Sequence, residues 1–245
     1  MTTAHHGLSL GHYPGRREGV GAVVVPAFLD SKASPWVVAQ ATALAADGIP
    51  AWTFDPRGTW SSTGTAADLG PSVQVADLLT LVATLPYEHV VLVGHCYGGH
   101  LALLAAVHDE RIRAVAAIAP TRCFLWDRPY AAAMDTWPTV KGRPFLRKEA
   151  NELREFWVPS SVVDDACRFD LVDTLRRLDR DVLFVAGDRD TVVDAGSVQT
   201  LHHACASPSS TFVQLPVGHD YRDSPAELRL VSDTVTKWVS GLFPG

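Results

Sequence analysis

The sequence predicts an α/β protein in which helices cover both faces of a mainly parallel sheet. Short valine-rich runs alternate with longer alanine- and leucine-rich runs along the chain, as expected for strands joined by helices. The short runs are apolar almost throughout, which is typical of parallel strands that are buried on both faces. The length of 245 residues and the 47% of hydrophobic residues suit one domain with a large core.

The expected strands are spaced so that a helix fits into most of the intervals between them. We expect strands at residues 20–26, 50–55, 89–94, 113–120, 181–187 and 210–216. After the first strand, the segment from Ser34 to Gly48 predicts a helix, because Ser-Pro is typical of a helix start and glycine of its end. The segments 70–85 and 224–242 open with a similar pair of serine and proline and predict two further helices.

One interval is too long for a single crossover helix. Residues 121–180 separate two expected strands, and such a length indicates an insertion. We therefore expect a core domain made of residues 1–120 and 181–245, with residues 121–180 forming a helical cap. Within the cap, the stretches 145–157 and 161–178 are expected to be helical.

Composition and charge exclude several classes of function. The formal net charge of −6 comes without a basic stripe, which argues against nucleic acid or an anionic membrane surface as partner. No apolar run is long enough for a membrane helix and no secretory signal is present, so we expect a cytoplasmic protein. The four cysteines are widely spaced and the histidines follow no metal-binding pattern, so we expect no disulfide framework, no metal and no cofactor.

The segment VVLVGHCYGGHLALLAA, residues 91–107, places Cys96 at the bend between an expected strand and an expected helix. This is the setting of a nucleophile elbow, a sharp turn of the form G-x-nucleophile-x-G. Gly94 and Gly98 would let strand and helix approach closely, so that the side chain between them stands above the sheet. A helix N-terminus stabilises a thiolate and a developing oxyanion. We therefore expect Cys96 to be a nucleophile, with a buried structural cysteine as the alternative.

This elbow and two later motifs resemble the α/β-hydrolase superfamily. In that superfamily the nucleophile, the acid and the histidine follow one another in this order along the chain. Asp190, in the segment GDRD, matches the position of the acid, and His219, in VGHD, matches the position of the histidine. The resemblance therefore implies the α/β-hydrolase fold and a triad of Cys96, His219 and Asp190. Asp188 is the alternative acid.

The resemblance also implies an oxyanion hole made of the backbone N–H groups of Phe28 and Tyr97. Phe28 lies in the segment VPAFLD, where the superfamily normally carries a His-Gly pair. The elbow G-x-C-x-G-G is similar to that of the dienelactone hydrolases, which also use cysteine, aspartate and histidine. Those enzymes carry an acidic residue in this loop that interacts with the thiol, whereas the loop here offers only Asp30.

The expected chemistry is acyl transfer from a small, largely apolar ester, lactone or thioester through an acyl-cysteine. Candidate substrate-binding residues are His95, beside the nucleophile, and the tryptophans of the expected cap, Trp126, Trp137 and Trp157. These tryptophans also suit a purely structural role in anchoring the cap. A lyase or an acyltransferase that uses the same site is the alternative function, and a binding module without activity is a further one.

Overall fold

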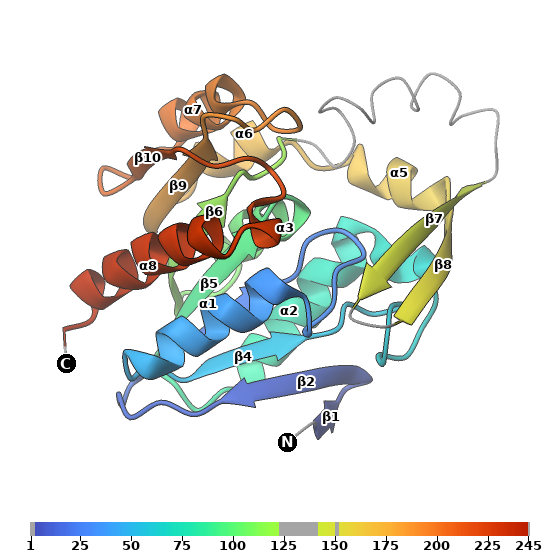
Figure 1. Ribbon diagram of the computed structural model, residues 1–245, viewed down its shortest axis with the longest axis horizontal. Helices are drawn as coiled ribbons and strands as arrows, with labels where there is room; N and C mark the ends of the chain where they lie inside the picture. Colours follow the sequence, from blue (N-terminus) through green and yellow to red (C-terminus); the bar gives the residue numbers. More distant parts are fainter. Residues whose placement is uncertain (1–2, 123–141, 150–151, 245) are drawn as a thin grey trace.

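The computed structural model describes residues 3–122, 142–149 and 152–244. An eight-stranded sheet runs through the molecule in the order β1-β2-β4-β3-β5-β6-β9-β10 (Figure 1). Its strands are β1 (Thr3–His5), β2 (Leu8–Tyr13), β3 (Val20–Val25), β4 (Ala51–Phe54), β5 (His89–His95), β6 (Ile112–Ile118), β9 (Asp181–Gly187) and β10 (Thr211–Leu215). From β4 to β10 the strands are parallel, and β2 pairs antiparallel with both β1 and β4. The predicted α/β class and mainly parallel sheet are confirmed.

The two N-terminal strands did not figure among the expected strands. In β2 the buried leucines Leu8 and Leu10 alternate with Ser9 and Gly11. Such alternation indicates a strand, but here it covers only a few residues. The glycine within it, a residue that is unfavourable in strands, weakens the signal further. The strands β1 and β2 extend the parallel core by an antiparallel pair at one edge.

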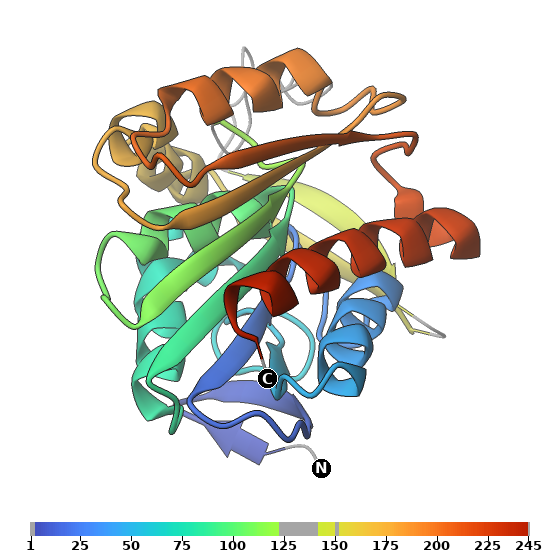
Figure 2. The ribbon, with the colours of Figure 1, turned by 90° about the vertical axis from the view of Figure 1, so that its left-hand side faces the viewer.

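Helices cover both faces of the sheet (Figure 2). α1 (Pro35–Ala46) and α8 (Pro225–Leu242) pack on one face, and α2 (Pro71–Thr84), α3 (Tyr97–Ala106) and α7 (Ala195–Ala204) on the other. β3 shows why the sheet needs both layers: Val23 and Val25 join the cluster under α2 and α3, while Ala22 and Val24 join the cluster under α1 and α8. Successive side chains of a strand point to opposite faces, so a fully apolar strand has to be covered twice.

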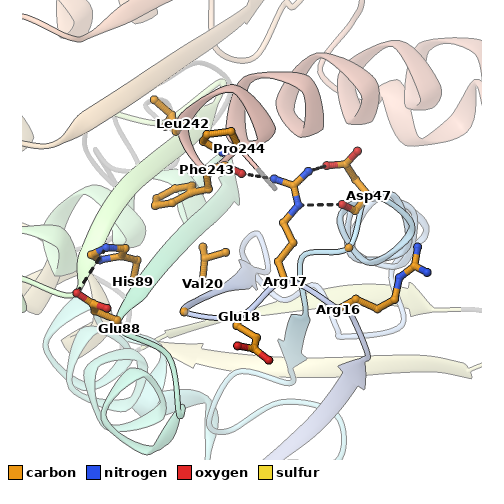
Figure 3. Close-up of a pocket in the computed structure, with 12 residues that line it drawn as sticks. Arg16, Arg17, Glu18, Val20, Asp47, Glu88, His89, Leu242, Phe243 and Pro244 are labelled. Carbon is orange, nitrogen blue, oxygen red and sulfur yellow. Dashed lines mark hydrogen bonds and ion pairs between the residues drawn. The ribbon is translucent and has the colours of Figure 1, made fainter.

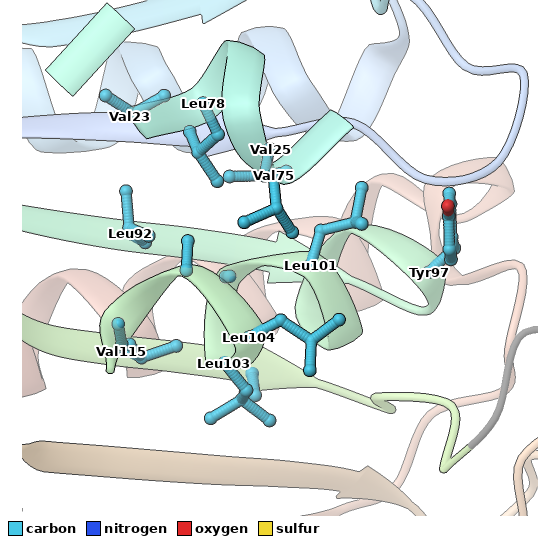
Figure 4. Packing of buried hydrophobic residues seen from close by; sticks show 14 of the residues in the cluster. Val23, Val25, Val75, Leu78, Leu92, Tyr97, Leu101, Leu103, Leu104 and Val115 are labelled. Carbon is cyan, nitrogen blue, oxygen red and sulfur yellow. The ribbon is translucent and has the colours of Figure 1, made fainter. Parts of the chain in front are cut away.

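Among the described helices, α3 is the one that is buried along its whole length. All its residues from Tyr97 to Ala106 are buried, and Figure 4 shows Leu101 and Leu104 within the same cluster as Leu92 and Val115 of the sheet. Burying a leucine contributes about 1.5–3 kcal/mol relative to leaving it exposed. The N-terminal end of α3, where the predicted nucleophile lies, is therefore held by the core itself.

The stretch 145–157 is not helical, and this expectation was wrong. β7 (Gly142–Glu149) and β8 (Glu152–Pro159) form an antiparallel hairpin that is separate from the main sheet. The residues of β8 alternate: Phe156 and Val158 are buried, whereas Trp157 is 58% exposed. Glutamate, leucine and arginine favour helices locally, but packing one face of a strand against the core outweighs that weak preference.

The stretch 161–178 does form helices, as expected. α5 (Ser161–Ala166) and α6 (Leu171–Leu175) bury Val162, Leu171 and Leu175 against the core. Two short 3₁₀ helices complete the described elements, η1 (Ala66–Leu69) and η3 (Tyr221–Asp223).

Candidate active site

Cys96 lies at a strained bend between β5 and α3. Its backbone angles are φ 54° and ψ −119°, and a positive φ in a residue other than glycine costs roughly 1–3 kcal/mol. The strain is held by hydrogen bonds: the Cys96 N–H donates to the Ile118 carbonyl at 2.9 Å, and the His100 N–H donates to the Cys96 carbonyl at 3.1 Å. The side chain remains partly accessible to solvent. This geometry is that of a nucleophile elbow.

Both glycines of the elbow are required by close backbone contacts. A Cβ atom on Gly94 would lie 2.3 Å from the Gly98 carbonyl carbon, and one on Gly98 would lie 2.2 Å from the Val25 carbonyl oxygen. No side chain fits at such distances, so only glycine allows α3 to start where it does. The second contact also brings the start of α3 against the loop that follows β3.

His219 and Asp190 are in direct contact. The Nδ1 atom of His219 lies 2.8 Å from Oδ2 of Asp190. The other oxygen, Oδ1, accepts hydrogen bonds from the Val192 and Val193 N–H groups, both at 2.8 Å. The Asp190 side chain is only 1% exposed, so its orientation is set by these partners. The rival acid, Asp188, has a side chain that is 44% exposed and lies near Arg189.

Cys96 lies close enough to His219 to affect its pKa. Burial by itself would lower the pKa of His219, but the contacts with Asp190 and Cys96 and the charges of these two groups raise it to about 10. The imidazole therefore carries a proton at neutral pH and lies between a carboxylate and a sulfur. A thiol beside a protonated histidine has the surroundings of a reactive cysteine.

His95 lies behind His219, away from the solvent. Its ring centroid is 4.8 Å from that of His219, 5.1 Å from Tyr221 and 5.5 Å from Trp36. Burial and the positive charges of His219 and Arg222 lower the pKa of His95 well below its usual value, so its ring is neutral. The sequence marked His95 as a candidate substrate-binding residue, but the structure places it among other side chains, 1% exposed.

Phe28 lies in the loop between β3 and α1, next to the start of α3. Its ring meets Tyr97 edge-on at 5.9 Å and Phe145 of β7 at 5.5 Å. The Trp60 side chain donates a hydrogen bond to the Leu29 carbonyl at 3.0 Å and so fixes the same loop. The two predicted oxyanion-hole residues, Phe28 and Tyr97, are thus neighbours.

Phe145 is a site residue that the sequence did not indicate. It lies on β7, and it reaches Phe28 because the hairpin turns one face toward the core. No alternation of apolar and polar residues marks 142–149 as a strand, so the sequence carries no clear signal for it. Trp157 points the other way, while Trp126 and Trp137 lie outside the described residues.

Among the described residues, no group of three or more histidine, cysteine, aspartate or glutamate side chains is arranged to hold a metal ion. In that same part of the chain, every helix is too short or too polar to cross a membrane.

A cavity of about 720 Å³ opens at the other end of the sheet (Figure 3). It is lined by Val20 and His89, which begin β3 and β5, and by Phe243 near the C-terminus. Arg17 crosses it and binds Asp47 at 2.7 Å. Cys96 follows the opposite, carboxyl end of β5, so this cavity does not belong to the site described above.

Comparison with known proteins agrees with this geometry. The family model described as alpha/beta hydrolase fold matches residues 23–158, whereas no curated protein sequence matches the chain. Among solved structures, the mouse alpha/beta hydrolase domain-containing protein 10 is similar at a TM-score of 0.80 and 20% identity, over 99% of this chain and 98% of that one.

Two further solved structures are similar as well. Est1E from Butyrivibrio proteoclasticus, solved with ferulic acid bound, has a TM-score of 0.72 at 20% identity over 98% of this chain and 97% of its own. The monoacylglycerol lipase of Paleococcus ferrophilus has a TM-score of 0.77 at 17% identity over 96% of this chain and 98% of its own. At these identities the likeness concerns the fold. From the family match and the nucleophile elbow together, the chain belongs to the α/β-hydrolase fold family.

Proposed function

We propose that this chain is a hydrolase that cleaves a carboxylic ester, lactone or thioester through an acyl-cysteine intermediate. One observation carries the proposal: His219 is hydrogen-bonded to Asp190 and lies close enough to Cys96, on the strained elbow, for Cys96 to raise its pKa. A nucleophile, a base and a group that orients the base form the constellation of covalent acyl transfer. The monoacylglycerol lipase among the similar structures supports an ester substrate.

In the first half of the reaction, the Cys96 thiolate attacks the carbonyl carbon of the substrate. The carbonyl oxygen becomes an oxyanion, which the backbone N–H groups of Phe28 and Tyr97 stabilise. When the tetrahedral intermediate collapses, the bond to the alkoxide or thiolate leaving group breaks and His219 donates its proton to that group. The acyl group is then bound to Cys96 as a thioester.

In the second half, His219 changes from acid to base. The raised pKa of His219 depends in part on the charge of Cys96, and acylation removes that charge. With its pKa lowered, His219 takes a proton from water while the hydroxide attacks the thioester. Collapse of the second intermediate releases the carboxylic acid, and Cys96 leaves as the thiolate beside protonated His219. Asp190 keeps the imidazole oriented throughout.

The surroundings of Phe28 favour a substrate with a largely apolar acyl group. Phe28, Tyr97 and Phe145 form an aromatic cluster beside the elbow. We propose that residues 121–180 act as a cap that excludes water from this group.

Intact-protein mass spectrometry tests the proposal. The protein is exposed to a panel of p-nitrophenyl esters, lactones and acyl thioesters and quenched in acid. We expect an acyl-sized mass increase in the wild type and in Cys167→Ala, which removes an exposed thiol, but none in Cys96→Ala. Turnover by Cys96→Ala should fall on the order of 10⁴-fold.

Other outcomes point to other functions. An acyl group that remains on Cys96→Ala, or undiminished turnover by that variant, would end the assignment of the nucleophile. A product that lacks the elements of a carboxylic acid, formed without any adduct, would identify a lyase. Transfer of the acyl group to an added alcohol in preference to water would identify an acyltransferase.

A further inference from the structure

A partly buried ion pair joins the loop that carries His219 to the loop that carries Phe28. Arg222 lies in η3, three residues after His219, and its Nη1 donates to both carboxylate oxygens of Asp30, at 2.9 and 3.0 Å. Asp30 lies two residues after Phe28, and its side chain is only 4% exposed. The partners are 192 residues apart in sequence.

Asp30 is also tied to the start of α1. The indole N–H of Trp36 donates to Asp30 Oδ2 at 2.9 Å. The Trp36 ring packs against His95, and the His95 ring packs against His219. From η3, Tyr221 contacts the same His95 ring. The ion pair and the ring contacts therefore form one connected group of side chains, which touches the His219 ring through His95.

The pair has a stronger effect on geometry than on stability. Removing two charges from water costs free energy that their attraction only partly returns, so a buried pair is weak evidence for stabilisation. The Asp30–Arg222 pair is fixed by several directional hydrogen bonds. Asp30 accepts from Arg222 and Trp36, and Arg222 also donates to Asp220 at 2.9 Å. Such a pair defines how the two loops lie relative to each other.

Each loop has its own internal support, which the pair does not supply. The Asp30 N–H bonds the Ala27 carbonyl at 3.0 Å, closing a turn, and the Gly218 N–H bonds Glu227 at 3.2 Å. Loss of the pair would therefore leave both loops folded while freeing their relative position. In catalysis a displacement of about 1 Å can cost on the order of 100-fold in rate.

We propose that Arg222 is a positioning residue, which acts through Asp30 to keep the imidazole of His219 and the backbone N–H of Phe28 at the separation that acyl transfer needs. Arg222 touches neither substrate nor reacting atoms in this role. The inference rests on the proposed function, since it assigns His219 as the acid and base and Phe28 to the oxyanion hole.

Steady-state kinetics of four single variants and one double variant test this role. Arg222→Gln and Asp30→Asn should each lower kcat about 10- to 100-fold and change KM by less than about threefold, because positioning acts on the transition state. Arg222→Lys should recover part of the loss. The double variant Arg222→Gln/Asp30→Asn should be no slower than the slower of the two single variants, because each substitution already breaks the same ion pair.

Arg17→Gln is the matched control (Figure 3). The Arg17 side chain is 20% exposed against 25% for Arg222, and it binds Asp47 and the Phe243 carbonyl at the opposite edge of the sheet. It should match wild-type kcat, with circular dichroism melting used to run all assays well below unfolding. An equal loss in Arg17→Gln, or kcat within twofold of wild type in all Arg222 and Asp30 variants, would overturn the proposal.

A second readout separates this inference from the proposed function. The rate at which iodoacetamide alkylates Cys96 at pH 7 depends on the contact with His219 but requires no ester substrate. Arg222→Gln should lower it about 3- to 10-fold, and Arg17→Gln should not. If the wild type turns over no substrate of the panel, the proposed function fails, but the alkylation rate of Cys96 still tests the positioning role of Arg222. An unchanged alkylation rate in Arg222→Gln would refute that role by itself.

Discussion

At the scale of single residues, the site distinguishes two carboxylates that are two positions apart. Asp190 is buried and accepts from the backbone as well as from His219, whereas Asp188 is largely in solvent. Asp190→Asn should lower kcat on the order of 10³- to 10⁴-fold by favouring the wrong imidazole tautomer. Asp188→Asn should stay within about twofold. A crippled Asp188→Asn variant beside a normal Asp190→Asn variant would reverse the assignment; steady-state kinetics decide it.

Cysteine reactivity gives a second prediction at this scale. Cys167 is exposed and Cys96 only partly so, so access alone would make Cys167 the faster thiol. The protonated His219 beside Cys96 should reverse that order, because the thiolate is the species that reacts. Peptide mapping after a short iodoacetamide pulse at pH 7 should find Cys96 modified first. The same pulse on His219→Gln should restore the order set by exposure.

Motif order along the chain was enough to predict the contact between His219 and Asp190, since both follow strands that end at the same edge of a parallel sheet. The Asp30–Arg222 pair could not be predicted in this way. Its partners lie in loops from distant parts of the sequence, and no local pattern relates them. Phe145 was missed for another reason, because its stretch was expected to be helical.

At the scale of elements, the junction of β5, α3 and the loop after β3 sets the geometry of the bend at Cys96. Gly98→Ala would place a methyl group against the carbonyl oxygens of Val25 and Pro26. We expect it to cost about 1–3 kcal/mol of stability and to lower kcat more than 10-fold, because α3 must shift. Gly241→Ala, in α8, meets no neighbour within 4 Å and is the control. Urea unfolding and kinetics measure both effects; wild-type behaviour of Gly98→Ala would contradict the close contact.

The elements differ in how well the sequence predicted them. Parallel strands buried on both faces are continuous apolar runs, so β3, β5 and β9 were readily located. The hairpin β7–β8 is half exposed and rich in residues that favour helices, so its local preference and its final structure disagree. Packing of Phe156 and Val158 against the core decides in favour of the hairpin, and this packing cannot be predicted from the local sequence.

At the scale of the whole molecule, the raised pKa of His219 links stability to pH. The folded value of about 10 lies above the ordinary 6.5, so the folded state binds the proton more tightly than the unfolded state. This contribution is complete below pH 6.5, declines above it, and is gone above about pH 10. Urea unfolding across this range should show a steeper decline for the wild type than for His219→Gln. Parallel curves would show that His219 is not held by Asp190 and Cys96 in solution.

The complete burial of α3 has a consequence for how the protein moves. Because every residue of the helix lies in the core, the bend at Cys96 cannot open by local fluctuation and belongs to the unit that unfolds cooperatively. Amide hydrogens of α3 should therefore exchange only when the whole domain unfolds.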